Sequence, residues 1–253
     1  MSVDSDFRDR LTRGEPLIGS FIKTPSVHAT EILGELGFDF IVVDEEHGPF
    51  DRWSIDLVML AAKASGLAGI VRVAGPSSIL SALDLGATGI IAPHTDTADQ
   101  AAKVAAASRY KGGQRGCSPS PRAGRYGGMS LADHVARADA QTSVIVMIEH
   151  PDAIRNVDAI AATEGVDALF LGLGDLAVAS GEPSAGTPAI RRAAQDACEA
   201  ARRHSKALMA TSSTVESGSW LIDLGVNALV VNSDQGLMIS AAAEQLEAFR
   251  SRG

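Results

Sequence analysis

Charged side chains that could bind a metal ion follow several apolar runs of the sequence. The acidic run DEEH occupies positions 44–47, and two further acids, Glu149 and Asp175, follow later runs. Two carboxylates on neighbouring strands could hold one hard divalent cation through oxygen. Either acid could equally cap the next helix or pair with an arginine. The pair therefore predicts a metal site, with a purely structural role as the alternative.

Two further residue types suggest proton transfer and anion binding. Asp44 and His47 could act as an orienting carboxylate and a general base, although a single His after a strand is more often structural. Arg72 directly follows an apolar run, where a guanidinium needs an anionic partner because an unpaired buried charge is costly. That partner could be Glu46, Asp44 or an anionic substrate.

The elements that must position these side chains are short strands alternating with helices. Each of eight runs is almost continuously apolar, which is typical of parallel strands buried on both faces. Helical spacing of apolar residues separates the runs, as in Ala153 to Ala162. The runs are 17–22, 38–43, 69–73, 89–92, 144–148, 166–171, 207–210 and 226–231.

This alternation predicts α/β architecture, a single (β/α)8 TIM barrel spanning residues 1–253. An open doubly wound sheet is the alternative, but no GxGxxG follows the first run, which lowers its dinucleotide-binding form. In a barrel the active site lies at the C-terminal ends of the strands, so the charged residues above converge on one rim. Ser212, near the end of the seventh run, becomes a candidate substrate contact.

One segment is loosely structured and basic. Residues Lys111 to Met129 are rich in Gly, Ser and Pro, which is typical of an active-site loop or a subunit contact. No acid occurs between Gln100 and Ala132, where six basic residues lie: Lys103, Arg109, Lys111, Arg115, Arg122 and Arg125. The stretch could attract an anionic substrate, or it could be a solvated or salt-bridged surface.

Composition excludes several classes of protein. A formal net charge of −9 argues against nucleic-acid binding, which needs a basic face. The polar N-terminus lacks the apolar core of a signal peptide, and no run approaches the roughly 18 apolar residues of a membrane span. We therefore expect a cytoplasmic protein with no membrane partner. No lysine lies within the eight runs, which disfavours a Schiff-base aldolase.

Ordered blocks of the sequence resemble the HpcH/HpaI aldolase/citrate lyase family, the metal-dependent class II pyruvate aldolases. The resemblance covers nearly the whole chain, and it implies a barrel of the phosphoenolpyruvate/pyruvate-domain type. Its blocks are GFDFIVVDEEHGPFD (37–51), VRV (71–73), LDLGATGIIAP (83–93), RYKGGQRG (109–116), IEHPDAIRNVDAIAATEGVDALFLGLGDLA (148–177) and the segment 225–234.

The resemblance implies a carbon–carbon lyase, a class II aldehyde-lyase. It would split 4-hydroxy-2-oxo acids into pyruvate, or a close 2-oxo acid, and an aldehyde through a metal-stabilised enolate. Family members of this kind act on 4-hydroxy-2-oxoheptanedioate or 2-dehydro-3-deoxyglucarate, in the catabolism of aromatic compounds or sugar acids. The alternatives are an oxaloacetate-type decarboxylase, which forms the same enolate, and a catalytically weakened protein that binds oxo acids.

The resemblance also implies roles for single residues. Glu149 and Asp175 match the metal ligands, for Mg²⁺ or Mn²⁺ first and with Co²⁺, Ni²⁺ or Zn²⁺ as further options, and Glu46 matches the acid that holds metal-bound water. The catalytic matches are the His47–Asp44 dyad, Arg72 at the enolate oxygen, and Asp84 donated across a subunit interface. The substrate contacts are the Gly174 amide and Arg122, the latter for an acidic aldehyde.

Two positions depart from the family pattern. Met147 stands where the family usually has Gln, which removes a hydrogen-bonding amide from beside the metal. Gly174 stands in a block usually written Gly-Pro-Ala-Asp, which gives the backbone before Asp175 more freedom. Both departures put the aldehyde acceptor in question more than the metal. The family also implies a homo-oligomer, commonly a hexamer built as a trimer of dimers with the last helix exchanged.

Overall fold

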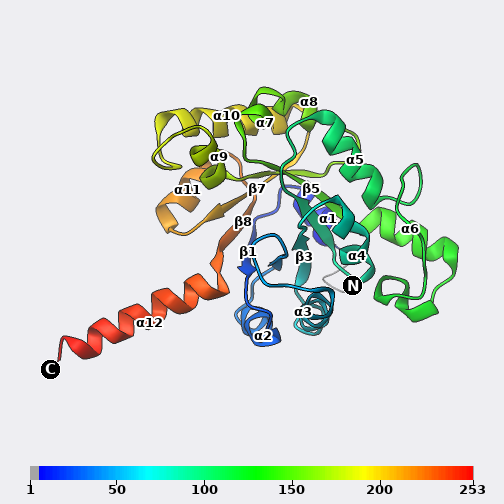
Figure 1. Cartoon of the computed structure of the whole chain (residues 1–253), viewed down its shortest axis with the longest axis horizontal. Coiled ribbons are helices and arrows are strands. Elements are labelled where there is room, and N and C mark those ends of the chain that lie inside the picture. The colour runs from blue at the N-terminus through cyan, green and yellow to red at the C-terminus, as the bar shows by residue number, and fades with distance from the viewer. Residues whose placement is uncertain (1–5, 253) are drawn as a thin grey trace.

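Eight parallel strands close into a barrel in the computed structural model, which describes residues 6–252 (Figure 1). Each strand pairs with the next along the chain, and β8 closes on β1. This closure confirms the predicted (β/α)8 barrel and excludes the open sheet. The strands are β1 (Leu17–Ile22), β2 (Phe40–Asp44), β3 (Ala68–Arg72), β4 (Gly89–Ala92), β5 (Ser143–Ile148), β6 (Ala168–Leu171), β7 (Ala207–Ser212) and β8 (Ala228–Ser233).

Helices connect successive strands and form the outer layer of the barrel (Figure 1). They are α1 (Phe7–Thr12), α2 (Val27–Glu35), α3 (Arg52–Ala64), α4 (Ile79–Asp84), α5 (Ala98–Ser108), α6 (Leu131–Gln141), α7 (Pro151–Arg155), α8 (Val157–Ala161), α9 (Leu173–Ala179), α10 (Pro188–Arg203), α11 (Val215–Asp223) and α12 (Asp234–Arg250), with the 3₁₀ helices η2 (Pro76–Ser78) and η3 (Arg122–Gly127). The single helix expected over 153–162 is two short helices, because the backbone breaks at Asn156.

The core has two layers because side chains alternate along each strand. On β2, Phe40 and Val42 belong to the cluster inside the barrel, whereas Ile41 and Val43 belong to the cluster between strands and helices. Helix α1 covers the N-terminal ends of the strands, where the Phe7 ring lies 5.4 Å from the Phe40 ring. The barrel interior is therefore filled, and the opposite rim is left for a site.

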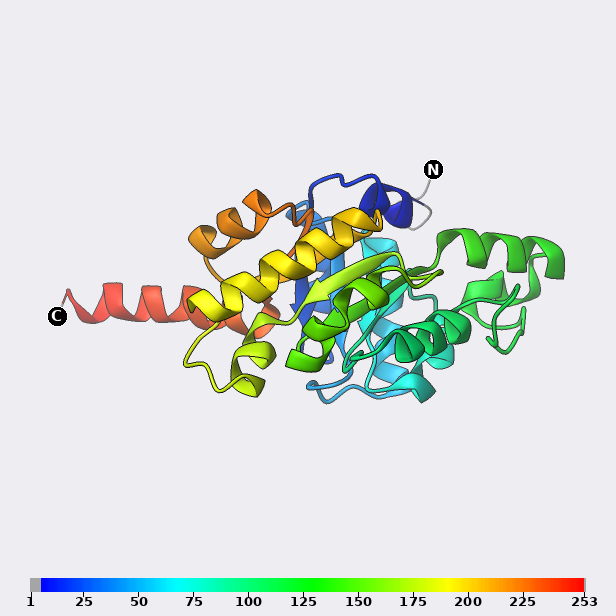
Figure 2. The ribbon, with the colours of Figure 1, turned by 90° about the horizontal axis from the view of Figure 1, so that it is seen from above.

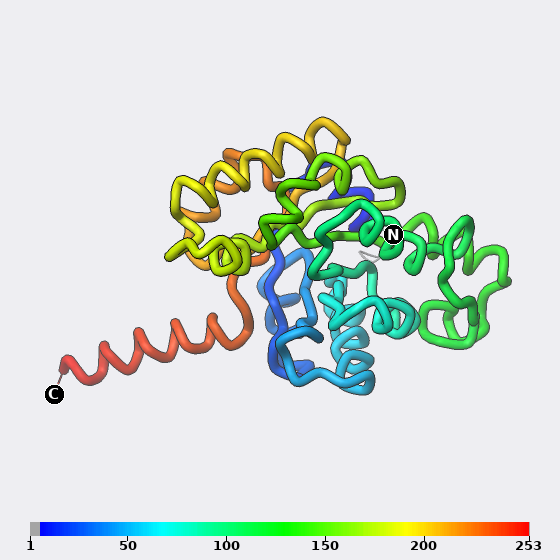
Figure 3. The backbone as a smooth tube through the Cα atoms, turned by 45° about the horizontal axis from the view of Figure 1, so that its top comes forward, coloured from blue at the N-terminus to red at the C-terminus, as the bar shows by residue number. Residues whose placement is uncertain are grey.

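The last helix stands apart from the barrel. Helix α12 extends away from the strands and ends at the C-terminus, on the side of the molecule opposite α6 (Figures 1, 2 and 3). None of its residues is buried, and it exposes a set of large apolar side chains: Leu237, Met238, Ile239, Leu246 and Phe249. Between residues 6 and 252, no helix combines the length and apolar character needed to cross a membrane. The first five residues of the polar N-terminal segment lie outside the described residues.

Candidate active site

A buried ion pair occupies the C-terminal ends of β2 and β3. Asp44 and Arg72 are register partners at the last positions of these strands, so the sheet itself places their side chains together. Arg72 donates from Nε to Asp44 Oδ1 at 2.9 Å and from Nη2 to Oδ2 at 2.7 Å. Asp44 is fully buried and Arg72 is 5% exposed. This two-pronged geometry fixes the guanidinium more firmly than a single contact would.

Asp44 stays ionised in this environment. Burial alone would raise its pKa, but the Arg72 charge, the Arg72 hydrogen bonds, the His47 backbone N–H and the Lys23 charge together hold the pKa below its ordinary value. Lys23 Nζ lies 3.2 Å from Asp44 Oδ2. Arg72 and Lys23 thus place two cations around one buried carboxylate at the rim.

His47 meets Asp44 through its backbone and not through its ring. The His47 amide donates to Asp44 Oδ1 at 3.2 Å, whereas its half-exposed ring lies nearest Glu46, with Nε2 3.8 Å from Oε2. Within residues 6–252 no direct contact joins the His47 ring to Asp44, and the expected dyad stays a prediction. The physical reason for the missing contact is that Arg72 and Lys23 already engage the Asp44 oxygens.

His94, just after β4, links an acid that follows β2 to an acid that follows β5. Its Nε2 lies 2.9 Å from Glu46 Oε1, and its Nδ1 lies 3.2 Å from Glu149 Oε1. The His94 backbone N–H also donates to Glu149 Oε1 at 2.7 Å. His94 has φ 54°, in the left-handed region that non-glycine residues rarely adopt. Glu46 in turn lies 3.4 Å from Arg72 Nε, so the residues form one connected rim network.

Glu149 is a buried carboxylate surrounded by further acids. Burial raises its pKa, and so do the charges of Glu46 and Asp175, while the His94 amide and the His94 charge act in the opposite direction. A divalent cation at this point would relieve both the desolvation and the repulsion between carboxylates. The donor chemistry of Glu149 and Asp175 therefore fits a hard, oxygen-seeking cation.

Two protein carboxylates are not a complete ligand set. Within residues 6–252, no three His, Cys, Asp or Glu side chains are arranged to hold a metal ion together. Mg²⁺ usually keeps several waters and uses only one or two protein carboxylates, so a site completed by water and substrate is compatible with this arrangement.

Gly172, at the end of β6, keeps the space in front of Glu149 free. A Cβ on Gly172 would lie 2.7 Å from Glu149 Cβ, 3.1 Å from Met147 Cε and 3.2 Å from Glu149 Oε2. Any larger residue would displace the acid or the methionine. Met147 itself is buried on the wall of the cavity, so an apolar thioether lies where the family amide was expected.

A cavity of about 570 Å³ opens beside this network. Arg72, Met147, Gly174 and Asp175 line one part of it, and side-chain hydroxyls from the β7–α11 region line another: Thr211, Ser212, Ser213, Thr214 and Ser217. Arg191 of α10 also lines the cavity; its Nε donates to the Gly186 carbonyl at 3.2 Å, and its guanidinium carbon lies 4.8 Å from the centre of the Trp220 ring. The volume suits a small organic acid.

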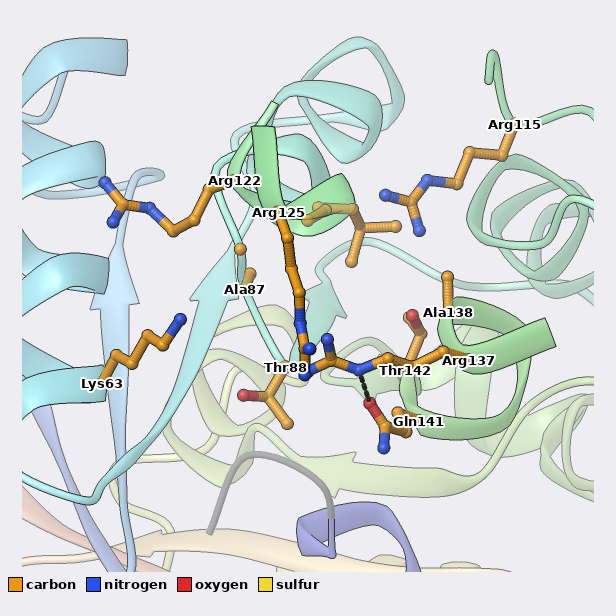
Figure 4. A pocket seen from close by; sticks show the side chains of 13 residues that line it. Lys63, Ala87, Thr88, Arg115, Arg122, Arg125, Arg137, Ala138, Gln141 and Thr142 are labelled. Carbon is orange, nitrogen blue, oxygen red and sulfur yellow. Dashed lines mark hydrogen bonds between the residues drawn. The ribbon is translucent and has the colours of Figure 1, made fainter. Parts of the chain in front are cut away.

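Two residues singled out from the sequence lie elsewhere in the single chain. Asp84, at the end of α4, faces Arg115, and Arg122 pairs with Asp56 at 2.7 Å. Arg122 lines a different pocket near the N-terminal ends of β4 and β5 (Figure 4). Arg122 is therefore not a substrate contact within one copy of the chain, because α4 and η3 hold it away from the rim.

Three residues of the site were not assigned a role from the sequence: Lys23, His94 and Arg191. Lys23 and His94 each follow an apolar run, which is the same signal that identified Glu149, so their positions were detectable in principle. Arg191 carries no such signal. It reaches the cavity only because α10 begins beside β6 and β7.

Comparisons with known proteins show which family and which fold this chain is similar to. The sequence matches the profile of the HpcH/HpaI aldolase/citrate lyase family over residues 17–241. It is 35% identical over 248 residues to the 5-keto-4-deoxy-D-glucarate aldolase of Klebsiella pneumoniae subsp. pneumoniae, with 96% of each chain covered. The fold is similar to an HpcH/HpaI aldolase/citrate lyase family protein from Burkholderia cenocepacia J2315, with a TM-score of 0.92, 29% identity, and 97% of this chain and 99% of that chain covered. It is also similar to the citrate synthase SbnG, with a TM-score of 0.88, 27% identity and 98% of each chain covered.

Proposed function

Because the chain belongs to the HpcH/HpaI aldolase/citrate lyase family and is a carbon–carbon lyase of the aldolase type, we propose that it cleaves 4-hydroxy-2-oxo acids. The products would be pyruvate, or a close 2-oxo acid, and an aldehyde. The observation that carries this proposal is the buried Asp44–Arg72 pair, which holds a guanidinium on the wall of the cavity that Asp175 also lines, with Glu149 within electrostatic range of Asp175.

Glu149 and Asp175 would hold a divalent cation, with Mg²⁺ or Mn²⁺ as the best match to two carboxylates. When bound, the cation supplies positive charge where negative charge develops on the oxygen of the 2-oxo acid. Glu46 lies within reach of the same region through its contacts with Arg72 and His94. We propose that Glu46 positions water there.

Arg72 would donate to the keto oxygen of the substrate. Its Nε and Nη2 are engaged by Asp44, which leaves Nη1 for a substrate oxygen. A charged donor that is already fixed in place needs little reorganisation when the negative charge appears, and such preorganised stabilisation is often the largest catalytic contribution. Asp44 is thus the positioning residue for Arg72.

Proton transfer would belong to His47. As the bond between C3 and C4 breaks, the 4-hydroxyl gives up its proton and the aldehyde leaves, while the bonding electrons remain on the 2-oxo acid as an enolate. The carbon of the enolate then takes a proton and becomes a methyl group. The half-exposed His47 ring beside Glu46 can exchange this proton through a water molecule.

The walls of the cavity favour an acidic, hydroxylated aldehyde. The hydroxyl groups near β7 offer both donors and acceptors, and Arg191 offers a charged planar donor. A sugar-acid fragment carries hydroxyls and a carboxylate that match these groups. The relative from Klebsiella pneumoniae subsp. pneumoniae is named for such a substrate, 5-keto-4-deoxy-D-glucarate, and we propose the same class for this chain.

A second copy of the chain would complete the assembly. We propose that it covers the exposed apolar side chains of α12, in a homo-oligomer such as a hexamer built as a trimer of dimers. A neighbouring copy would also be the route by which Asp84 or Arg122 reaches a substrate, since neither does so within its own chain.

The test is a metal-supplemented assay of pyruvate release from a panel of 4-hydroxy-2-oxo acids with oxaloacetate included. Release from keto-deoxy sugar acids, lost after chelation and restored by Mg²⁺ or Mn²⁺, supports the proposal. Turnover of oxaloacetate alone would favour a decarboxylase, and thermal stabilisation by oxo acids with no turnover would favour a binding protein. His47→Ala should lower turnover far more than metal affinity; an unchanged rate would remove His47 as the proton carrier.

A further inference from the structure

A second pocket lies at the opposite end of the barrel from the active site. It has a volume of about 90 Å³ and is built where Thr88 and Thr142 precede β4 and β5 (Figure 4). Five basic side chains line it, from α3, the segment before η3, η3 itself and α6: Lys63, Arg115, Arg122, Arg125 and Arg137. Among residues 6–252, none that lines the pocket is acidic, although the whole chain has a net charge of −9.

Two of these arginines are incompletely paired. Arg115 is only 7% exposed, and the one carboxylate contact that it makes in the described part of the chain, from Nη2 to Asp84 Oδ1, is 3.4 Å long. A strong charge-assisted hydrogen bond is about 2.7–2.9 Å. The Nε atoms of Arg115 and Arg122 are buried without a hydrogen-bond partner, although Arg122 Nη2 binds Asp56. Buried guanidinium nitrogens of this kind require an acceptor.

A left-handed backbone segment beside the pocket carries Arg125, one of the basic residues that line it. Arg125 and Tyr126 lie in the left-handed region, with φ 53° and 57°, at a cost of the order of 1 kcal/mol each. Arg125 reaches into the pocket, and its guanidinium points toward that of Arg137 (Figure 4). Cations gathered in one pocket repel one another, and a bound anion would lower that repulsion.

Gly86 makes room for another of the cations. Its φ is +97°, and a Cβ at this position would lie 2.7 Å from Arg122 Cδ. A larger residue would therefore push Arg122 away from the lining. The position of Arg122 in the pocket therefore depends on the absence of a side chain at Gly86.

We propose that this pocket binds a small oxyanion such as inorganic phosphate. The forked donors of arginine match the oxygen geometry of phosphate, sulfate or a carboxylate. The volume is well below the roughly 300–1,000 Å³ of ordinary ligand pockets, so it admits an ion or a single acidic group and no larger organic body. Within one copy of the chain the site is separate from the rim, because the two lie at opposite ends of the strands.

The experiment is thermal unfolding of the full chain with and without inorganic phosphate. No divalent cation is added, and a chloride control has the same ionic strength. We expect about 10 mM phosphate to raise Tm by roughly 2 °C or more over chloride. Sulfate and acetate, compared in parallel, distinguish a tetrahedral anion from a carboxylate. A rise that is equal in phosphate and in chloride overturns the proposal.

Variants locate the effect. Arg125→Gln should weaken phosphate binding in calorimetry at least about tenfold, the result of losing one charge-assisted hydrogen bond. Ala138→Glu places a carboxylate on the pocket wall, and it should raise Tm in chloride and abolish the response to phosphate. Lys103→Gln is the matched control: it removes a charge from the same basic stretch, at an exposed side chain paired with Asp99, and should leave the response intact. If both Arg125→Gln and Ala138→Glu keep the full response, the anion binds elsewhere and the inference fails.

Discussion

Arg72 donates two hydrogen bonds to Asp44, of 2.9 and 2.7 Å, from register-matched positions at the ends of adjacent strands. Strand pairing, and not a flexible loop, therefore sets the direction of the guanidinium. The same pair joins the ends of β2 and β3, and it fixes a cation on the cavity wall before any substrate binds.

Asp44→Asn should destabilise the protein strongly. The variant leaves the buried Arg72 without its counter-charge, and breaking a buried ion pair costs about 3–5 kcal/mol. Urea unfolding measures the loss, and kcat/KM should fall with it because Arg72 is no longer held. Asp158→Asn is the matched control, since it removes an exposed carboxylate paired with Arg203, and we expect almost no change there. An equal loss in both variants would show that the Asp44 pair has no special role.

The difference in the free energy of unfolding between the wild-type protein and Asp44→Asn should depend on pH and disappear in acid. Because the pKa of Asp44 is lower when folded, its contribution is fully present above the ordinary value of 3.8 and is lost as the pH falls through the folded pKa. Unfolding curves from neutral pH down to acid should therefore converge below pH 3.8. A difference that persists unchanged in strong acid would contradict an ionised Asp44.

Glu149→Gln and Asp175→Asn should each abolish metal binding while leaving the barrel folded. Removal of a supporting residue costs roughly 10–100-fold in metal affinity, and removal of a direct ligand should exceed that. Calorimetric titration with Mn²⁺ measures the affinity, and circular dichroism checks the fold. Asp152→Asn, an exposed acid just after the same strand as Glu149, is the control. Unchanged Mn²⁺ affinity in both variants would remove these acids as ligands.

Arg191→Met should lower kcat/KM about tenfold or more for acidic aldehydes and leave neutral aldehydes unaffected. The reason is that only a carboxylate on the substrate would use this charge on the cavity wall. Arg192→Met is the neighbouring control, because Arg192 does not line the cavity. The measurement is the rate of aldol addition of pyruvate to a paired series of aldehydes. Equal losses for acidic and neutral acceptors would make Arg191 a purely structural residue.

The barrel could be predicted from the sequence because its strands are buried on both faces. In the sequence such strands are almost continuously apolar runs. Two strands have the predicted bounds residue for residue, Leu17–Ile22 and Gly89–Ala92. Once the strands are known, the polar residues that follow them must share one rim. The placement of Arg72 and Asp175 on one cavity, with Glu149 within electrostatic range of Asp175, follows from that rule alone.

The contacts within the rim could not be predicted, because they depend on turns and packing. The His94 amide reaches Glu149 because the His94 backbone is left-handed. No residue type in that turn predicts a left-handed conformation. The His47 ring points toward Glu46 because two cations compete for Asp44, and that outcome depends on distances between strands. Arg122 was expected at the substrate, but α3 supplies Asp56 as its partner.

Helix α12 has seventeen residues and none of them is buried. Its apolar side chains therefore add little to the free energy of unfolding of an isolated copy, and an isolated helix of this length is marginal in water. The proposed assembly would make this helix a concentration sensor. On dilution the copies would separate, α12 would fray first, and any residue that one copy lends to another's cavity would be lost before the barrel itself began to unfold.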